Sequence, residues 1–443
     1  MATPYSGGDD VPNLAVAARK CPNHRRAPEE ASNFDERDHM KRFHRCMSIA
    51  VLATLAFASA SSAQDFTVFN RPVQVHGFAS QGFAYTNHNN FLTMNTTNGS
   101  PAFTDGVLNV STSITDKFRL SAQGYTRKVG QLDDFRPELD FAFGDYRFTT
   151  WLGVRAGRVK TAIGLYNDTQ DAEFLYTWAL LPQGVYPLDL RNAMIAHDGV
   201  DVYGRISLRQ IGKLNYTAYA GKRTFDDRGG YYTFASDLGM PITAESGRAV
   251  GWDLRWSTPL KGLTLGSSWT DLTQDRKGVF TAAGFVPGAP YTGLSSPQRT
   301  AVGYGDFQRG RWDFSGEYRA SDYWLNILVD LPGVPPFPWN GSNECWFLAS
   351  TYQASKRISV GIYHSNLHVD APWNPADTAS NHIYDEVGAF RYDINRFWTA
   401  KAEGHLMDGY GDIFSTQGFY QRSNPDGFKP KTNMLVLRTS VTF

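Results

Sequence analysis

Three features that would point to other classes of protein are scarce in this sequence. Beyond residue 63 no apolar run reaches the roughly 18 residues that indicate a membrane-spanning helix, so that part is not a helical membrane protein. Of the three cysteines, only Cys345 lies beyond residue 63, which excludes an intramolecular disulfide there. Lys+Arg and Asp+Glu are equal at 43 each, so no nucleic-acid-binding surface is indicated.

Signature motifs of several enzyme and metal-binding classes are also missing. The chain has no glycine-rich phosphate loop and no cysteine cluster of the zinc-binding kind, so no cofactor is implied. It has no repeated motif of about 40 residues, which a β-propeller would need. The mean hydropathy of −0.38 is still compatible with strands that are apolar on alternate residues only.

What the chain does have is a last strand that finishes on its final, aromatic residue. Alternate residues from 433 to 443 separate an apolar, β-branched face from a face with hydroxyls and a charge. The first face carries Leu435, Leu437, Thr439, Val441 and Phe443, and the second carries Arg438, Ser440 and Thr442. This ending resembles the terminal signal by which bacterial outer-membrane barrels are recognised for assembly. It implies that Phe443 is an assembly signal, with the barrel-assembly machinery and outer-membrane lipid as partners.

The beginning of the chain indicates export. A basic start at residues 40–42 precedes a short apolar run, and small residues follow up to Ala63. These features define a secretory signal peptide, so we expect residues 40–63 to be cleaved after Ala63. Residues 1–39 are polar and mixed in charge, and we interpret them as a mis-assigned start or a disordered extension. The mature protein, residues 64–443, is then expected in the outer membrane of a Gram-negative bacterium.

Alternation with a period of two predicts the strands of the mature chain. Sixteen segments qualify, near residues 73–86, 106–114, 117–127, 137–147, 150–160, 197–208, 213–223, 249–258, 262–271, 299–307, 311–320, 344–354, 357–368, 383–393, 396–407 and 433–443. Short turns follow the even-numbered segments and long loops follow the odd-numbered ones, as in barrels with short periplasmic turns and long extracellular loops. We therefore predict an all-β fold, a transmembrane antiparallel β-barrel of 16 strands. An extra hairpin around residues 321–343 would make 18.

The polar faces of these strands predict a charged interior. A mid-bilayer Arg or Lys on the lipid face would cost roughly 2–4 kcal/mol, and sixteen or more strands enclose an aqueous channel. The basic candidates for lining the pore are Arg119, Arg155, Arg205, Arg255, Arg319, Lys401 and Arg438. The acidic candidates are Asp140, Asp201, Asp253, Asp313, Glu317 and Glu403. Alternatively, these charges pair across neighbouring strands and stiffen the wall.

A distinctive stretch begins at the end of the fifth segment and fills the third long loop. It matches the pattern G-R-x-K-x-P-x-G-L-Y-N, then R-D, then L-L-P-Q-x-V-Y, at Gly157, Arg158, Lys160, Gly164, Leu165, Tyr166, Asn167, Asp171, Leu180, Leu181, Pro182, Gln183, Val185 and Tyr186. Ala162 replaces the proline of the pattern and Gln170 its arginine. The stretch resembles the corresponding region of the phosphate-selective porin-like family. The resemblance implies a general or specific porin whose third loop folds inward and narrows the pore.

The third long loop, residues 161–196, carries aromatic side chains that are not expected to stay in water. We therefore expect this loop to fold into the barrel. Its candidates for the constriction, together with the residue just before it, are Lys160, Asp168, Asp171, Glu173, Asp189 and Arg191. In the alternative interpretation, the aromatic residues pack on the inner wall and the charges are solvated.

These features predict a porin, a passive diffusion channel for small hydrophilic solutes and ions. The pore candidates are seven basic and six acidic residues, and the third loop is acidic, so weak selectivity is expected. Anions such as phosphate are among the candidate solutes. A homotrimer is expected by analogy with sixteen-stranded porins.

Two other classes of function compete with the porin. A non-conducting receptor, adhesin or scaffold barrel would use its long loops to bind a partner outside the cell. A barrel hydrolase would need a nucleophile, a base and an orienting group within hydrogen-bond reach. The candidates are His197 with Asp198 and Asp201, and His364 with Ser365 and His368, of which His364 and His368 share a face that could bind a metal weakly. Neither set has a third metal ligand or a catalytic motif, so we predict no enzyme, no catalytic residue and no metal site.

Overall fold

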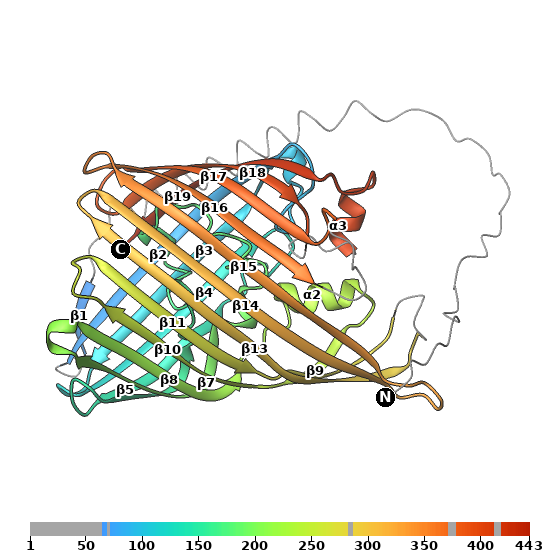
Figure 1. Ribbon diagram of the computed structural model, residues 1–443, viewed down its shortest axis with the longest axis horizontal. Helices are drawn as coiled ribbons and strands as arrows, with labels where there is room; N and C mark the ends of the chain where they lie inside the picture. The colour runs from blue at the N-terminus through green and yellow to red at the C-terminus, as the bar shows by residue number, and fades with distance from the viewer. Residues whose placement is uncertain (1–63, 69–70, 282–286, 371–377, 412–417) are drawn as a thin grey trace, which may run out of the picture. The chain divides into compact units, whose positions relative to one another are not determined.

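The computed structural model describes residues 64–68, 71–281, 287–370, 378–411 and 418–443. The expected signal peptide and the extension before it, residues 1–63, lie outside the described residues. The described strands form one antiparallel sheet that closes on itself (Figure 1). Within these ranges, the helices are all too short or too polar to cross a bilayer.

Sixteen of the described strands form the wall of the barrel, as predicted. They are β2 (Arg71–Thr86), β3 (Ser100–Ser113), β4 (Phe118–Val129), β5 (Glu138–Arg147), β6 (Gly153–Lys160), β7 (Ala196–Ser207), β8 (Lys213–Arg223), β10 (Arg248–Ser257), β11 (Leu263–Leu272), β13 (Pro290–Arg309), β14 (Trp312–Val329), β15 (Phe337–Gln353), β16 (Ile358–Asp370), β17 (His382–Asp393), β18 (Trp398–Gly409) and β19 (Lys431–Thr442). Each pairs with the next in this series.

The last wall strand pairs with the first and closes the barrel. Leu437 of β19 lies opposite Phe83 of β2, and the pairing extends to the final residue, where Phe443 and Gly77 exchange two backbone hydrogen bonds of 3.0 Å. A short strand, β1 (Gln64–Val68), pairs with the other end of β2. Closure matters because every backbone polar group within a bilayer must find a partner inside the protein.

The connections alternate between short turns at one end of the barrel and longer segments at the other. In the turn between β10 and β11, the Thr258 amide donates to the Leu263 carbonyl over 3.0 Å. Gly262 has a φ of 91°, and a Cβ there would lie 1.9 Å from the carbonyl oxygen of Gln308. Only glycine fits this turn. The short connection between β7 and β8 contains the 3-10 turn η4 (Arg209–Ile211).

The longer connections contain additional elements. These are η1 (Thr96–Asn98), η2 (Glu173–Leu175), η3 (Arg191–Ala193), α2 (Gly230–Asp237), β9 (Ile242–Ser246), β12 (Asp275–Val279) and α3 (Gly418–Ser423). β12 pairs with β9 and with the first residues of β13, so this part of the sheet extends beyond the closed wall.

The expected loop 321–343 and the extra hairpin within it were wrong. β14 continues to Val329 and β15 begins at Phe337, with Ile327 opposite Phe337, so residues 330–336 form the connection. β14 extends further than predicted because β13 is also longer and supplies it with strand-pairing partners, as Tyr291 does for Val329. The expected loops 87–105 and 272–298 are shortened for the same reason, since β3 and β13 begin before their predicted starts.

The distribution of side chains on the wall is the reverse of that in a soluble protein, with apolar residues outside and charged residues inside. Its outward residues are large, apolar and exposed, for example Leu437 at 43% and Ile362 at 67%. Its inward residues include buried charges, for example Arg438 at 7% and Lys401 at 4%. Exposed apolar area on this scale is stable only when an apolar medium or a partner covers it. The alternation of apolar-out and polar-in is the pattern of a membrane barrel.

Replacing an outward apolar residue with a cation should therefore destabilise the barrel when it is embedded in lipid. We expect Leu437→Arg, in the middle of β19, to lower the free energy of unfolding in phosphatidylcholine vesicles by roughly 2–4 kcal/mol. Leu260→Arg is the matched control, because Leu260 is also an exposed leucine but lies in the turn between β10 and β11. Denaturant titrations followed by tryptophan fluorescence measure both variants. Equal losses in the two would contradict a lipid-facing position for Leu437.

Candidate functional site

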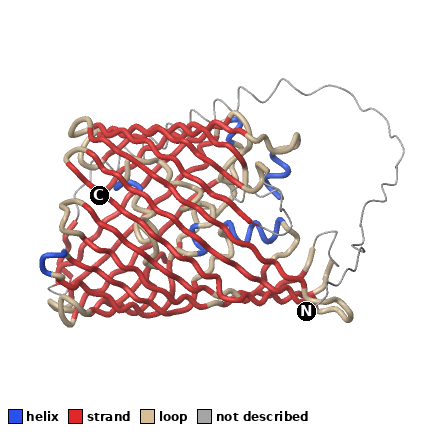
Figure 2. The backbone as a smooth tube through the Cα atoms, in the orientation of Figure 1, coloured by secondary structure: helices blue, strands red, loops and turns tan. Residues whose placement is uncertain are grey.

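Residues 161–196 lie inside the barrel and contact the wall on several sides. The segment leaves the end of β6 at Thr161 and returns to β7 at Ala196. Between these points it contacts β11, β14, β17, β18 and β19 through hydrogen bonds. Because these strands belong to one closed wall, a segment that reaches all of them crosses the interior. Figure 2 shows loop segments running within the strand wall.

The second half of this segment fills one side of the interior with apolar side chains. Trp178 is 4% exposed and packs edge-on against Tyr363 of β16, with ring centres 5.0 Å apart. Leu180 and Tyr186 belong to the same buried cluster, which also includes Phe347 of β15. The aromatic residues of the segment are therefore removed from water by the inner wall, and this side of the interior is packed.

Glu317 of β14 anchors the first part of the segment. Its carboxylate accepts hydrogen bonds from the Leu165 amide at 2.6 Å and the Tyr186 hydroxyl at 2.5 Å, and it also pairs with Arg319. Gly164, with a φ of 65°, fits against it, since a Cβ there would lie 2.5 Å from a Glu317 carboxylate oxygen. A buried carboxylate with three donors is well satisfied, which keeps this contact rigid.

A second group of wall charges binds the backbone of residues 173–180. Glu403 accepts hydrogen bonds from the Ala179 and Leu180 amides at 2.7 and 2.9 Å. Lys401 donates to the carbonyl and carboxylate of Glu173, both at 2.6 Å, and to the Trp178 carbonyl at 2.9 Å. These charge-assisted bonds hold the main chain of the segment.

Two arginines extend this second group. Arg438 of β19 donates to the Ala179 carbonyl at 2.8 Å and pairs with Asp105 of β3 at 2.7 Å. Arg391 of β17 donates to the Phe174 and Tyr176 carbonyls at 2.7 and 2.9 Å. Sequence reasoning missed Asp105 and Arg391. Asp105 fell at the last position of an expected loop, and nothing in the strand pattern distinguished Arg391 from other polar residues.

A third group of charges joins both ends of the segment to β5. Lys160 and Arg191 each contact both Asp140 and Asp171, and the Lys160–Asp140 distance is 2.9 Å. All four side chains are at least largely buried. Burial raises the pKa of the Asp171 carboxyl, but Arg191 and Lys160 outweigh it and hold that pKa below its usual range. The Asp171 carboxyl is therefore ionised at neutral pH.

The remaining predicted residues lie outside these three groups. Arg255 pairs with Asp253 at 2.9 Å and reaches Asp168 of the segment at 3.5 Å, with its side chain 30% exposed. Arg155 is 33% exposed and lies 3.5 Å from Asp145. The others have local partners: Arg119 with Ser111, Arg205 with Asn215, Asp313 with Gln308, and Asp201 with His197. Asp189 is 2% exposed.

Neither set of candidate hydrolase residues forms a catalytic arrangement. His364 lies on the outward face and pairs with the exposed Glu386 at 2.6 Å, whereas Ser365 is buried on the opposite face. Two adjacent residues of a strand point to opposite sides of the sheet, so Ser365 cannot be activated by His364 or by His368. His197 bonds to Asp201 at 2.9 Å and is fully buried, while Asp198 faces outward and pairs with Arg158. The grouping of His197 with Asp198 was therefore wrong.

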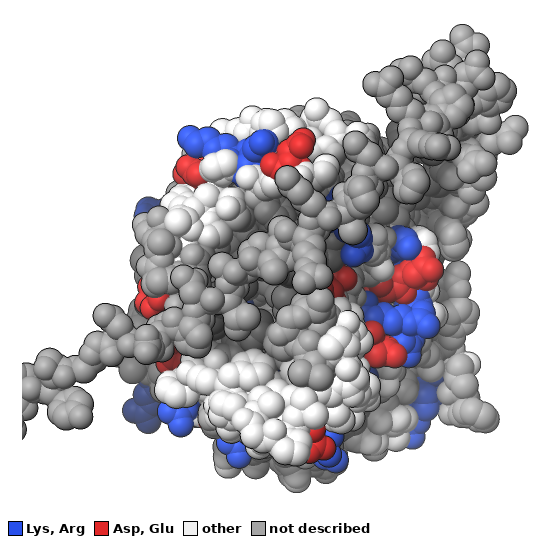
Figure 3. Space-filling view, turned by 90° about the vertical axis from the view of Figure 1, so that its right-hand side faces the viewer, with Lys and Arg blue, Asp and Glu red and all other residues white. Residues whose placement is uncertain are grey.

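A cavity of about 430 Å³ lies beside the segment, and Tyr186 and Pro187 of the segment belong to its lining. Its lining includes charged and aromatic side chains from the segment, the wall and the loop elements, among them Asp189, Arg223, Arg276, Arg319, Tyr323 and Trp324. Figure 3 views the barrel from the end that carries the longer connections and shows basic and acidic side chains in mixed groups. Among the described residues on this face, neither sign of charge dominates.

The closed sixteen-stranded wall with a segment lying inside it defines a porin-like barrel. The fold is similar to that of OmpT of Vibrio cholerae, with a TM-score of 0.52 and 12% identity over 86% of this chain and 100% of that one. It is also similar to the outer-membrane channel DcaP of Acinetobacter baumannii, with a TM-score of 0.51 and 11% identity over 86% and 99%.

OmpF of Salmonella typhi, solved with daunomycin, has a TM-score of 0.52 and 11% identity over 85% of this chain and 100% of that one. No protein-family model and no curated protein sequence matches the chain. At these identities the likeness concerns the fold alone.

Removing the charge of Glu403 should loosen residues 179 and 180 without opening the wall. We expect Glu403→Gln to speed hydrogen exchange at the Ala179 and Leu180 amides about tenfold, because hydrogen bonds to a charged acceptor contribute roughly 1.5–3 kcal/mol and those to a neutral one less. Glu386→Gln on β17 is the control, since that carboxylate faces outward. Exchange measured by mass spectrometry in detergent compares the two variants. Unchanged exchange at these amides in Glu403→Gln would refute the anchoring role.

Proposed function

We propose that this protein is an outer-membrane porin, through which small hydrophilic solutes diffuse passively. The observation that carries the proposal is a wall that is apolar outside and charged inside, around an interior that contains a packed apolar cluster and, next to it, a cavity. Barrels of this strand number are wide enough to enclose an aqueous channel. The likeness in fold to DcaP, described as an outer membrane channel, supports the same reading.

The route we propose runs beside residues 161–196, past the charged side chains that stay partly exposed. The charges with partly exposed side chains, such as Arg155 and Arg255, are the pore-lining residues in this proposal. Asp168 and Arg255, 3.5 Å apart, mark the constriction, because one belongs to the segment and the other to the wall. Lys401, Arg438, Glu317 and Glu403 instead hold the segment in position.

We expect the pore to discriminate only weakly between anions and cations, because most of its charges are paired. Most cations of the interior have a carboxylate within ion-pair distance, as Arg255 has Asp253 and Arg319 has Glu317. An ion pair presents little net charge to a passing solute, and strong anion selection needs an excess of unpaired Arg and Lys. Inorganic phosphate is therefore one candidate solute among other small ions.

Charge removal at the constriction should change ion preference in opposite directions. We expect Arg255→Gln to raise the ratio of cation to anion permeability about twofold and Asp168→Asn to lower it by a similar factor. Planar-bilayer recordings in a potassium chloride gradient give this ratio from the reversal potential. Lys261→Gln is the control, because Lys261 lies in the exposed turn between β10 and β11.

The same recordings test the porin function itself. Discrete open steps are expected from the unmodified protein. A folded barrel that never conducts would overturn the porin proposal and favour a non-conducting receptor, adhesin or scaffold. A homotrimer, with Phe443 as the assembly signal for insertion into the outer membrane, completes the proposal. Chemical cross-linking of the protein in native membranes tests the trimer.

A further inference from the structure

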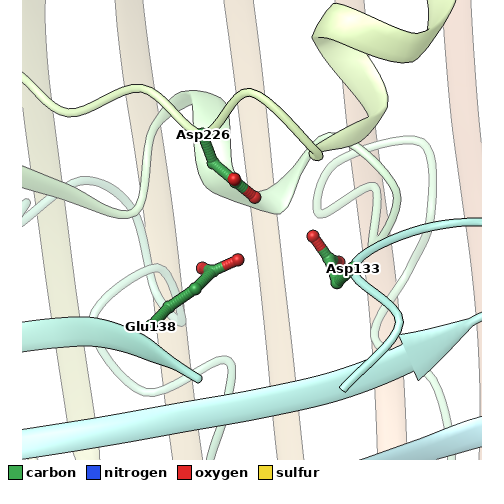
Figure 4. A group of neighbouring side chains, drawn as sticks. All are labelled: Asp133, Glu138 and Asp226. Carbon is green, nitrogen blue, oxygen red and sulfur yellow. The ribbon is translucent and has the colours of Figure 1, made fainter. Parts of the chain in front are cut away.

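Three carboxylates from separate parts of the chain meet at the end of the barrel that carries the longer connections. Asp133 lies between β4 and β5, Glu138 is the first residue of β5, and Asp226 follows β8. One oxygen atom from each lies within 4.8 Å of the others. Figure 4 shows the three side chains pointing toward one another. Asp133 and Glu138 are close in sequence, but Asp226 is distant from both. The sequence pattern therefore did not reveal the group.

The group has fewer positive partners than negative charges. Among the described residues, the group forms one ion pair, between Asp133 and the buried Arg127. The nearby Arg136 pairs with Asp227 instead, at 2.7 Å. If all three were ionised, three carboxylates with one guanidinium would carry an excess negative charge in a largely buried site, and like charges this close repel strongly.

Hydrogen bonds satisfy this group only in part. The Asn192 amide donates to one oxygen of Asp226 at 2.5 Å and to Glu138 at 3.3 Å, and the Arg228 backbone amide donates to the other oxygen of Asp226 at 3.1 Å. The second oxygen of Asp133, Oδ1, has no hydrogen-bond partner, although this residue is only 2% exposed. A buried carboxylate oxygen without a partner is costly, and it calls for a ligand. Figure 4 shows one Asp133 oxygen directed toward Asp226.

We propose that Asp133, Glu138 and Asp226 bind a divalent cation of the calcium type. Calcium takes oxygen ligands, including carboxylates from loops, in flexible arrangements. The absence of thiol and imidazole groups from this donor set disfavours softer transition metals. A cavity of about 230 Å³ borders Glu138 and Asp226 and leaves room for water molecules that would complete the coordination. The ion would neutralise the group and tie the connection after β4 to the one after β8.

Calcium binding by the full-length chain, purified in detergent and stripped with a chelator, tests the proposal. Isothermal titration with calcium chloride is expected to show one ion bound per chain, and the midpoint of thermal unfolding is expected to rise when calcium is added. Glu138→Gln and Asp226→Asn should each weaken binding at least tenfold. Asp134→Asn is the matched control, because Asp134 is the next residue of the same connection but is exposed and pairs with Lys128.

Three results would overturn the proposal. They are the absence of binding heat together with an unchanged unfolding midpoint, an equal loss of affinity in Asp134→Asn, and magnesium binding as tight as calcium binding. Asp133 is left intact in these variants, since it also neutralises Arg127. If Glu138→Gln does not fold, Asp226→Asn and the titration of the unmodified protein still decide the question. None of these measurements depends on conduction, so this proposal and the porin function can fail separately.

Discussion

The hydrogen-bonded pairing of β19 with β2 is the constraint on which the rest of the structure depends. With that ladder closed, all wall strands have two neighbours, and no row of amides and carbonyls is left at an edge. The apolar faces can then point outward into lipid. As a direct consequence the polar faces point inward, and the interior receives charges that need partners in a confined space.

Residues 161–196 supply many of those partners. An isolated charge away from water is strongly disfavoured, and pairing with a second charge compensates only in part. Glu403, Lys401 and Arg438 therefore combine ion pairs with bonds to backbone amides and carbonyls of the segment. The sequence is compatible with two roles for these residues, lining of a pore and pairing across strands. The observed arrangement is a third, in which wall charges and loop backbone satisfy one another.

The fold could be predicted from the sequence to a large extent, because alternation in a strand is a local property. The faces of β10 and β18 follow it residue by residue. In the parts of β13, β14 and β15 nearest the longer connections, polar and apolar residues no longer alternate regularly, and the predicted ends of these strands were wrong. The site was less predictable still. Pairs such as Arg438 with Asp105, or Asp226 with Glu138, depend on which strands and loops are neighbours in space.

The wall holds residues 173–180 mainly through hydrogen bonds to their main chain. This has a consequence for which substitutions the segment can accept. Amide and carbonyl groups are the same whatever side chain a residue bears. Substitutions at Phe174, Tyr176 or Ala179 therefore leave the hydrogen bonds between the wall and the main chain in place, provided that the new side chain fits the space around it. The contacts with the wall therefore fix the course of the main chain, whereas the side chains of the segment determine its chemical character. New specificities can be introduced on a support that stays where it is.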